Sequence, residues 1–338
     1  WLIIKNIQNK NSSFIKNDML SFSLILGIVG VYVSSTFVRL EVFGSVAVIV
    51  LASLGLTALT KEFFKNKPQA KKPIGKLIKL SYAVGIIILL LIPMIFPVGS
   101  NVFAISKIPP TILNGGTTFP IISTDWLDSM EWIKNNTPED AVIAAWWDYG
   151  YWIQTKAERA SLADNSTIHT NIIVNIAKML LSNPDDAWIS LNKMQADYVL
   201  VFVAGQKLGI NSVEPLYVLG GGGDESKKQW FMRIADKDLS KYLFSDGLSG
   251  TDYFWNNTLL GKMFPFTPVT YVNFQTTEEF STYLPGFEPV YVKEIKYPSD
   301  GNGPLRLVYA SPSFIEEKVG PLIGIFIYEV NKEYNLTS

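Results

Sequence analysis

Long apolar segments dominate the first hundred residues. Leu20–Val38 and Val42–Thr60 each run for 19 residues without a charge, and only Arg39–Glu41 separates them. Leu80–Val98 is a third such segment, with two prolines near its end. A helix of about 20 apolar residues crosses the hydrocarbon core of a bilayer. We therefore predict three membrane-spanning helices within residues 1–100; buried helices of a soluble protein are the alternative.

The lysines between these segments predict the orientation. They precede the first span and fill the loop between the second and third: Lys5, Lys10, Lys16, Lys61, Lys65, Lys67, Lys71, Lys72, Lys76 and Lys79. Positive charges mark the cytoplasmic side of membrane proteins. We therefore predict that both segments are cytoplasmic, and that the Arg39–Glu41 break and everything after Val98 lie on the outer face.

Residues 101–338 change to the mixed pattern of a globular domain. Apolar residues recur at helical spacing in some segments and form short continuous runs in others. The predicted elements are a helix over Trp126–Ile133, a strand over Ala141–Ala145, helices over Thr170–Leu181 and Asn183–Gln195, and a strand over Ala196–Val203. Alternation of helices and strands favours a mixed α/β domain, here an extracytoplasmic one.

The end of the chain has a strand-rich pattern. Pro289–Tyr297 and Leu305–Ser311 flank Ser299–Gly303, a turn-forming segment, and Leu322–Val330 is another apolar run. Glycine, asparagine and aspartate between two strand-like runs indicate a hairpin. We predict that the first two runs pair with each other.

Composition narrows the chemistry. The 338 residues are 48% hydrophobic, carry a net charge of −1 and include no cysteine. A thiol nucleophile, a disulfide and a thiolate metal site are therefore excluded, and the charge gives no reason to expect nucleic acid as a partner. The chain opens within a pattern at Trp1, so we expect it to be the C-terminal part of a longer protein.

The most informative motif is Trp146-Trp147-Asp148-Tyr149-Gly150. Two indole N–H donors and one carboxylate acceptor match the two lone pairs and one hydrogen of a single hydroxyl group. A site built for a hydroxyl can reject an analogue without it by roughly 10⁴-fold. The alternative is structural: a strand end whose tryptophans cover a core and whose aspartate starts a turn.

The motif and its surroundings resemble the catalytic subunit of oligosaccharyltransferase (the STT3/AglB family). The resemblance covers Trp146–Ile153 and the following Ala157–Thr167, and it extends through most of the chain. That enzyme moves a lipid-linked glycan onto Asn of Asn-X-Ser/Thr. The resemblance implies that Trp146, Trp147 and Asp148 hold the Ser or Thr hydroxyl two residues after the acceptor Asn.

A second family motif lies in the glycine-rich segment Gly220–Lys228. This segment lacks the G-x-x-x-x-G-K-[ST] spacing of a phosphate loop, and a flexible turn before a helix is the structural alternative. Asp224 and Lys227 resemble the start of D-x-x-K-x-x-x-M, which helps bind the acceptor. Phe231 stands where the family has Met or Ile, so either Phe231 or the next residue, Met232, takes that apolar role.

The resemblance also implies donor contacts. Arg39 corresponds to an arginine that contacts the pyrophosphate of the lipid-linked oligosaccharide, and Tyr151 would face the same diphosphate. A guanidinium fork suits phosphate oxygens. The alternative for Arg39 is an interfacial anchor whose side chain reaches toward the headgroups.

The resemblance implies Mn²⁺ or Mg²⁺ as cofactor, held by carboxylates of loops that precede this segment in the family. We therefore expect no catalytic residue and no metal ligand among these 338 residues, and we expect the segment alone to be inactive.

The predicted function is transfer of an oligosaccharide from a dolichyl- or polyprenyl-(pyro)phosphate donor to sequon asparagines. The expected partners are the lipid-linked oligosaccharide, an acceptor polypeptide and the membrane. By the same resemblance, a D-x-x-K motif in place of the bacterial-type motif and a compact outer domain imply an archaeal protein, so we expect an archaeal cell membrane rather than the endoplasmic reticulum. The main alternative is a membrane-anchored module that binds a peptide or glycan without catalysis. A third alternative is a different polyprenyl-phosphate-sugar transferase of related membrane architecture. Its activity would not depend on a hydroxyl two residues after the acceptor Asn.

Overall fold

The computed structural model describes residues 18–36, 41–65, 73–107, 110–119, 121–209, 215–316 and 318–336. Contacts between Cα atoms divide the chain into two compact units, residues 1–105 and residues 106–338. Each unit is described by itself. The predicted boundary after residue 100 stays a prediction.

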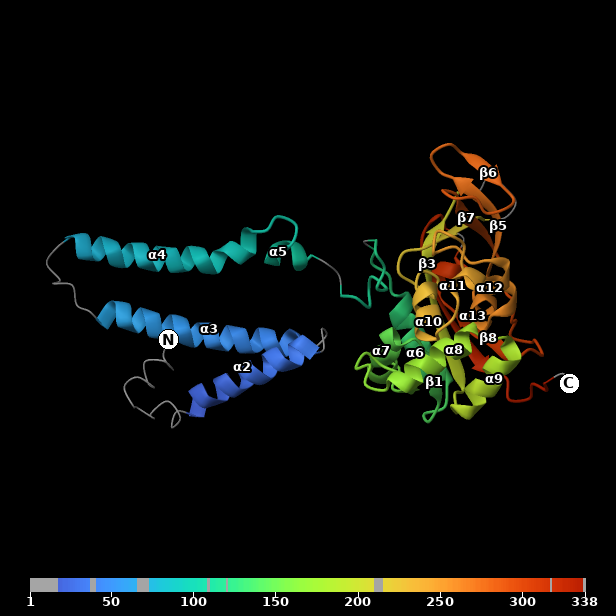
Figure 1. Ribbon diagram of the computed structural model, residues 1–338, viewed down its shortest axis with the longest axis horizontal. Helices are drawn as coiled ribbons and strands as arrows, with labels where there is room; N and C mark the ends of the chain where they lie inside the picture. Colours follow the sequence, from blue (N-terminus) through green and yellow to red (C-terminus); the bar gives the residue numbers. More distant parts are fainter. Residues whose placement is uncertain are drawn as a thin grey trace. The chain divides into compact units, whose positions relative to one another are not determined.

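The first unit is helical (Figure 1), with α2 (Asp18–Thr36), α3 (Glu41–Lys65), α4 (Pro73–Ile95) and the short α5 (Val102–Ile105). Within α3 and α4, Gly44–Lys61 and Leu77–Ile95 are long and apolar enough to cross a membrane. The apolar part of α2, Ser21–Ser35, is shorter. Two of the three predicted spans therefore have spanning dimensions, and the span predicted over 20–38 is not confirmed.

The second unit is the mixed α/β domain that the sequence predicts (Figure 1). Its helices are α6 (Asp125–Asn136), α7 (Gly150–Thr155), α8 (Thr170–Leu181), α9 (Pro184–Lys193), α10 (Lys228–Ile234), α11 (Leu239–Tyr242), α12 (Asp252–Asn257), α13 (Leu259–Met263) and α14 (Pro312–Ile315). Its strands are β1 (Val142–Ala145), β2 (Ala160–Ser161), β3 (Tyr198–Lys207), β4 (Tyr217–Leu219), β5 (Phe266–Asn273), β6 (Glu278–Phe280), β7 (Glu288–Lys293), β8 (Leu305–Ala310) and β9 (Gly320–Val330).

Local sequence explains several of these boundaries. Helix α8 coincides with the predicted segment and buries Ile173, Ile176 and Leu180 along one face. Helix α9 begins after Asn183, whose side chain accepts a hydrogen bond from the Asp186 N–H, and Pro184 occupies its first turn. Both features are typical of helix starts. The predicted helices and the first two predicted strands are thus confirmed to within a few residues.

The described strands form one nine-stranded sheet, with β2-β1-β3-β4-β7-β5-β6 in line and β9 between β3 and β8. Strand β3 is the centre of this sheet. Along one edge it pairs with β9 over its full length, Tyr198–Lys207. On its other edge it pairs in parallel with β1 at Tyr198–Leu200 and in antiparallel with β4 at Gly205–Lys207. Residues 201–204 therefore face a gap between β1 and β4.

The predicted terminal hairpin is wrong. Strand β7 pairs with β5 and β4, whereas β8 pairs with β9. The Leu307 N–H still donates to the Tyr297 carbonyl over 3.0 Å. However, Pro298 and Pro304 flank the turn and carry no N–H, so no ladder can continue through them. The apolar strand β9 offers β8 a longer, buried edge instead.

Candidate functional site

The Trp-Trp-Asp motif follows the end of β1. Trp146 is extended, Trp147–Tyr149 form one 3₁₀ turn, and α7 starts at Gly150. A Cβ at position 150 would lie 2.2 Å from the Ala163 carbonyl oxygen, so only glycine fits there. The turn buries Trp146 and Tyr149 and leaves Trp147 and Asp148 partly exposed. The strand thus presents Asp148 from a rigid support.

The gap beside β3 is filled by the segment before α10. Asp224 exchanges two hydrogen bonds with Phe202: its Oδ2 accepts from the Phe202 N–H over 2.9 Å, and its own N–H donates to the Phe202 carbonyl over 2.7 Å. Glu225 Oε2 accepts from the Ala204 N–H over 3.2 Å. Two carboxylates therefore replace the missing strand, because buried backbone N–H groups require partners.

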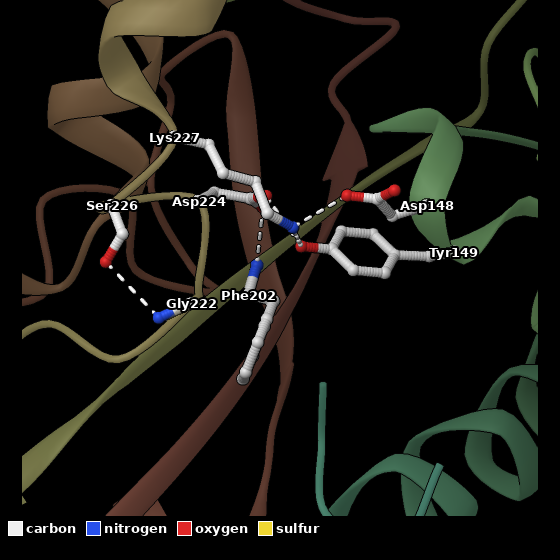
Figure 2. A network of polar contacts seen from close by, with 7 residues as sticks. All are labelled: Asp148, Tyr149, Phe202, Gly222, Asp224, Ser226 and Lys227. Atoms are coloured by element: carbon white, nitrogen blue, oxygen red, sulfur yellow. Dashed lines mark hydrogen bonds and ion pairs between the residues drawn. The ribbon is translucent and has the colours of Figure 1, made fainter. Parts of the chain in front are cut away.

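Gly223 permits this close approach. A Cβ at position 223 would lie 2.6 Å from the Ala204 nitrogen. Gly221 and Gly222 have φ angles of 120° and 109°, which side chains rarely allow. The Gly222 N–H also donates to Ser226 Oγ over 3.3 Å (Figure 2). The glycine run is therefore an ordered turn that seats Asp224 and Glu225 against β3.

Lys227 joins the two motifs (Figure 2). Its Nζ lies 2.8 Å from Asp148 Oδ2 and 3.0 Å from the Tyr149 hydroxyl, and Tyr149 donates to Asp224 Oδ1 over 2.7 Å. The Lys227 and Asp148 side chains are 23% and 25% exposed, so the ion pair is shielded on most sides. We name the chain Asp224–Tyr149–Lys227–Asp148 the polar relay. It connects the backbone of β3 to the carboxylate at the surface.

Burial shifts the pKa values of two residues of the relay, Asp224 and Tyr149. Burial raises the pKa of Asp224 to about 6, against the opposing effect of the Lys227 charge and the Phe202 N–H. Burial also raises the pKa of Tyr149 well above its usual value, and the adjacent Asp224 adds to this effect. Tyr149 therefore stays protonated at neutral pH and remains the donor to Asp224.

The relay forms part of the wall of a cavity of about 460 Å³. Asp148, Lys227, Tyr149 and Tyr151 all line it. Tyr151 is 45% exposed, as a side chain available to a ligand should be. Arg39, the other residue expected to contact a donor, lies outside the described residues.

Trp146 and Phe231 are not on the cavity wall. Both are buried, and their rings meet edge to face with centroids 4.4 Å apart. The Trp146 ring also lies 6.0 Å from that of Trp147. Met232, the other candidate for the apolar role, is buried as well. Phe231 thus supports the base of the Trp-Trp-Asp turn from within the core.

The residues of this site do not fit a divalent metal. Among the described residues, no group of three or more His, Asp or Glu side chains could hold one. Asp148 and Asp224 already share the Lys227 ammonium group, directly or through Tyr149. A cation entering between them would meet that positive charge.

Tyr149 is the site residue that sequence reasoning missed. Its position inside the five-residue motif was the available signal, but its partners Asp224 and Lys227 are 75 and 78 residues away. Its ring packs against Trp126 with centroids 4.7 Å apart. It therefore combines an apolar contact with the central hydrogen bonds of the relay.

Tyr149→Phe removes the central hydroxyl of the relay. We expect the unfolding free energy to fall by about 1–3 kcal/mol, because Asp224 Oδ1 loses its buried donor. Chemical denaturation of the purified protein, followed by tryptophan fluorescence, measures this. The control is Tyr309→Phe, because the buried Tyr309 hydroxyl has no partner among the described residues. Equal stability of Tyr149→Phe and wild type would contradict the relay.

Asp224→Asn tests the raised pKa. Between about pH 4 and 6 the native carboxyl holds a proton that the unfolded chain, with a pKa near 3.8, has released. The unfolding free energy of the wild type should therefore fall as pH rises through this window, by up to about 3 kcal/mol relative to the variant. Thermal unfolding of both proteins from pH 4 to 8 measures the difference. A constant difference, or one of opposite sign, would refute the assignment.

Residues 138–209 match the family model described as the STT3/PglB/AglB core domain. Across 331 aligned residues the chain is 24% identical to the dolichyl-diphosphooligosaccharide–protein glycosyltransferase subunit stt-3 of Caenorhabditis elegans, which covers 85% of this chain and 40% of that protein. It is 32% identical over 147 residues to the corresponding subunit of Schizosaccharomyces pombe, covering 44% of this chain and 17% of that protein. The chain thus spans less than half the length of these relatives, both of them eukaryotic.

Among solved structures, the chain is similar to the C-terminal globular domain of an oligosaccharyltransferase from Archaeoglobus fulgidus, at a TM-score of 0.35 and 18% identity, covering 62% of this chain and 99% of that one. A second A. fulgidus oligosaccharyltransferase, tethered to an acceptor peptide with an NVT sequon, has a TM-score of 0.38 and 15% identity, covering 87% of this chain and 37% of that one. A further crystal structure of that enzyme contains Zn and sulfate. The sequence matches thus show similarity to the STT3/PglB/AglB core domain over residues 138–209, and to STT3 subunits over a larger part of the chain.

Proposed function

We propose that the chain is part of an oligosaccharyltransferase and that its globular unit recognises the acceptor sequon. The reaction would transfer an oligosaccharide from a dolichyl- or polyprenyl-(pyro)phosphate donor to Asn in Asn-X-Ser/Thr. The observation that carries this proposal is the contact between the two family motifs: Lys227 of D-x-x-K pairs with Asp148 of Trp-Trp-Asp over 2.8 Å. The relatives named above carry this activity in their names.

Asp148 is the proposed acceptor of the +2 hydroxyl hydrogen. A carboxylate offers about four lone-pair sites, so Asp148 can bind Lys227 and a Ser or Thr hydroxyl together. Lys227 pairs with Asp148 Oδ2 over 2.8 Å, which fixes the orientation of the carboxylate. Lys227 and Asp224 therefore act on the acceptor through Asp148, by holding its carboxylate in place.

The aromatic residues supply the rest of the proposed acceptor site. Trp147 is partly exposed beside Asp148 and would place its indole against the sequon. The buried Trp146 and Phe231 support this turn from below. We therefore assign the apolar position of the second motif to Phe231 and propose that a threonine methyl packs on the surface that these rings stabilise.

The donor side involves Tyr151 and Arg39. Tyr151 is exposed on the same cavity wall as Asp148, which would bring a donor phosphate near the acceptor. We propose Mn²⁺ or Mg²⁺ as cofactor, held by residues other than the relay. When bound, it would supply positive charge for the donor phosphates. Holding the acceptor in position can itself lower a barrier by several kcal/mol, roughly 7–11 at best.

We propose that the globular unit lies on the extracytoplasmic face, where the lysine distribution places it. An archaeal source is part of the same proposal, and the motif pattern supports it. The donor and acceptor would then meet outside the cytosol.

The activity is tested with membranes that contain the full-length protein, lipid-linked donor and Mn²⁺. We expect transfer to an Asn-X-Thr peptide and not to its Asn-X-Ala twin. Asp148→Asn should lower kcat/KM by about 10- to 100-fold, because a hydrogen bond to a charged group is lost. Asp185→Asn, on the helix α9 start, is the matched control. Equal transfer to both peptides would refute the acceptor site, and retained peptide binding without transfer would favour a non-catalytic binding module.

The orientation is tested by single-cysteine labelling, with the unsubstituted protein as background control; these 338 residues contribute no cysteine of their own. We expect a membrane-impermeant maleimide to label Glu139→Cys on intact cells and to leave Lys71→Cys unlabelled until the cells are opened. Lys71 lies in the loop between the second and third predicted spans, outside the described residues. The reverse pattern would place the globular unit in the cytoplasm and contradict the proposal.

A further inference from the structure

A second cavity borders the segment that carries Asp224 and Lys227. It has a volume of about 290 Å³ and is lined by residues from β4, β7, the start of α10 and the loop before α12. Among its wall residues are Glu225, Lys228, Asp246, Leu248, Phe287 and Tyr291. Neighbouring residues of one segment thus line two cavities. Lys227 lines the first cavity, whereas Glu225 and Lys228 line the second.

The cavity wall includes two buried side chains that carry hydrogen-bond donors, Lys228 and Tyr291. Lys228 is 5% exposed, and its ammonium group donates to the Glu225 carbonyl, which uses one of its three N–H groups. Tyr291 is 3% exposed and lines the cavity. Burial raises the pKa of Tyr291, with added effects of Tyr271 and Glu225, so the hydroxyl keeps its hydrogen. A ligand hydroxyl in the cavity would offer an acceptor to both side chains.

The same wall carries fixed acceptors. Glu225 is buried, and its two oxygens accept from the Ala204 N–H and from Ser226 Oγ. Asp246 is held by the N–H groups of Leu248 and Ser249, each 2.9 Å from Oδ1. Each carboxylate retains lone pairs beyond these bonds. Hydrogen-bond donors and acceptors therefore line the same cavity, and internal hydrogen bonds hold the two carboxylates in place.

This arrangement selects the charge of a ligand. An anion would meet the carboxylates of Glu225, Asp246 and Glu288, whereas a cation would have to displace the Lys228 ammonium that already faces Glu225. A neutral ligand with several hydroxyl groups satisfies both kinds of partner, since each hydroxyl donates one hydrogen and accepts two. Phe287 and Leu248 add apolar surface for its C–H groups.

We propose that this cavity binds a neutral, hydroxyl-rich ligand of about the size of one sugar residue. The cavity volume lies at the lower end of ordinary ligand sites, which limits the ligand to that size. The proposal does not depend on the function proposed above, because it rests on the cavity alone.

The test uses the full-length protein in a detergent without a sugar headgroup. Saturation-transfer difference NMR measures binding of N-acetylglucosamine and methyl glucoside, with glucuronate and glucosamine as anionic and cationic counterparts. We expect saturable binding of the neutral sugars and weaker binding of both charged ones. Tyr291→Phe keeps the ring in place and should weaken binding by roughly three- to tenfold, the effect of one hydrogen bond.

Tyr297→Phe is the matched control, because it removes a buried hydroxyl that has no partner among the described residues and lies outside the cavity. It should bind the sugars as the wild type does. Absence of saturable binding by any neutral sugar would overturn the proposal. Binding that Tyr291→Phe leaves unchanged would place the sugar elsewhere and overturn it equally, as would tighter binding of a charged counterpart.

Discussion

The geometry of the site depends on an interruption in one edge of β3. Between its pairings with β1 and β4, the N–H groups of Phe202 and Ala204 have no neighbouring strand, and leaving a buried donor unpaired costs about 1–3 kcal/mol. The carboxylates of Asp224 and Glu225 meet this requirement. Two adjacent acidic side chains are thereby buried in the sheet, and each then needs cationic or hydroxyl partners of its own.

Those needs connect the fold to the chemistry. The Tyr149 hydroxyl donates a hydrogen bond to Asp224 and accepts one from Lys227. Lys227 also pairs with Asp148, and both line the larger cavity. Glu225 and Lys228 both lie on the wall of the smaller cavity. The need to pair the N–H groups of β3 therefore also positions Asp148, the residue proposed to bind the sequon hydroxyl. A substitution in the segment Asp224–Lys228 should therefore alter the walls of both cavities.

Local signals in the sequence predicted much of this fold. The apolar period of α8, the Asn183-Pro184 start of α9 and the apolar run of β3 each encode their own element. The pairing of distant strands was harder to predict from the sequence. The predicted hairpin is wrong because β8 pairs with β9 and not with β7. Family resemblance singled out Asp148, Asp224 and Lys227, and the structure joins them through direct contacts and Tyr149; their roles toward an acceptor stay predictions. The resemblance did not identify Tyr149, whose hydroxyl acts only through contacts some 75 residues away.

The most direct test of this account is a double-mutant cycle between Tyr149 and Asp148 in the full-length protein. Affinity for an Asn-X-Thr peptide is measured for the wild type, Tyr149→Phe, Asp148→Asn and the double variant. If the buried hydroxyl acts on the peptide through Lys227 and Asp148, its loss should matter only while Asp148 is present. We expect a coupling energy of about 1 kcal/mol, within the range found for residues in one hydrogen-bond network. Strict additivity of the two substitutions would show that the relay does not position Asp148.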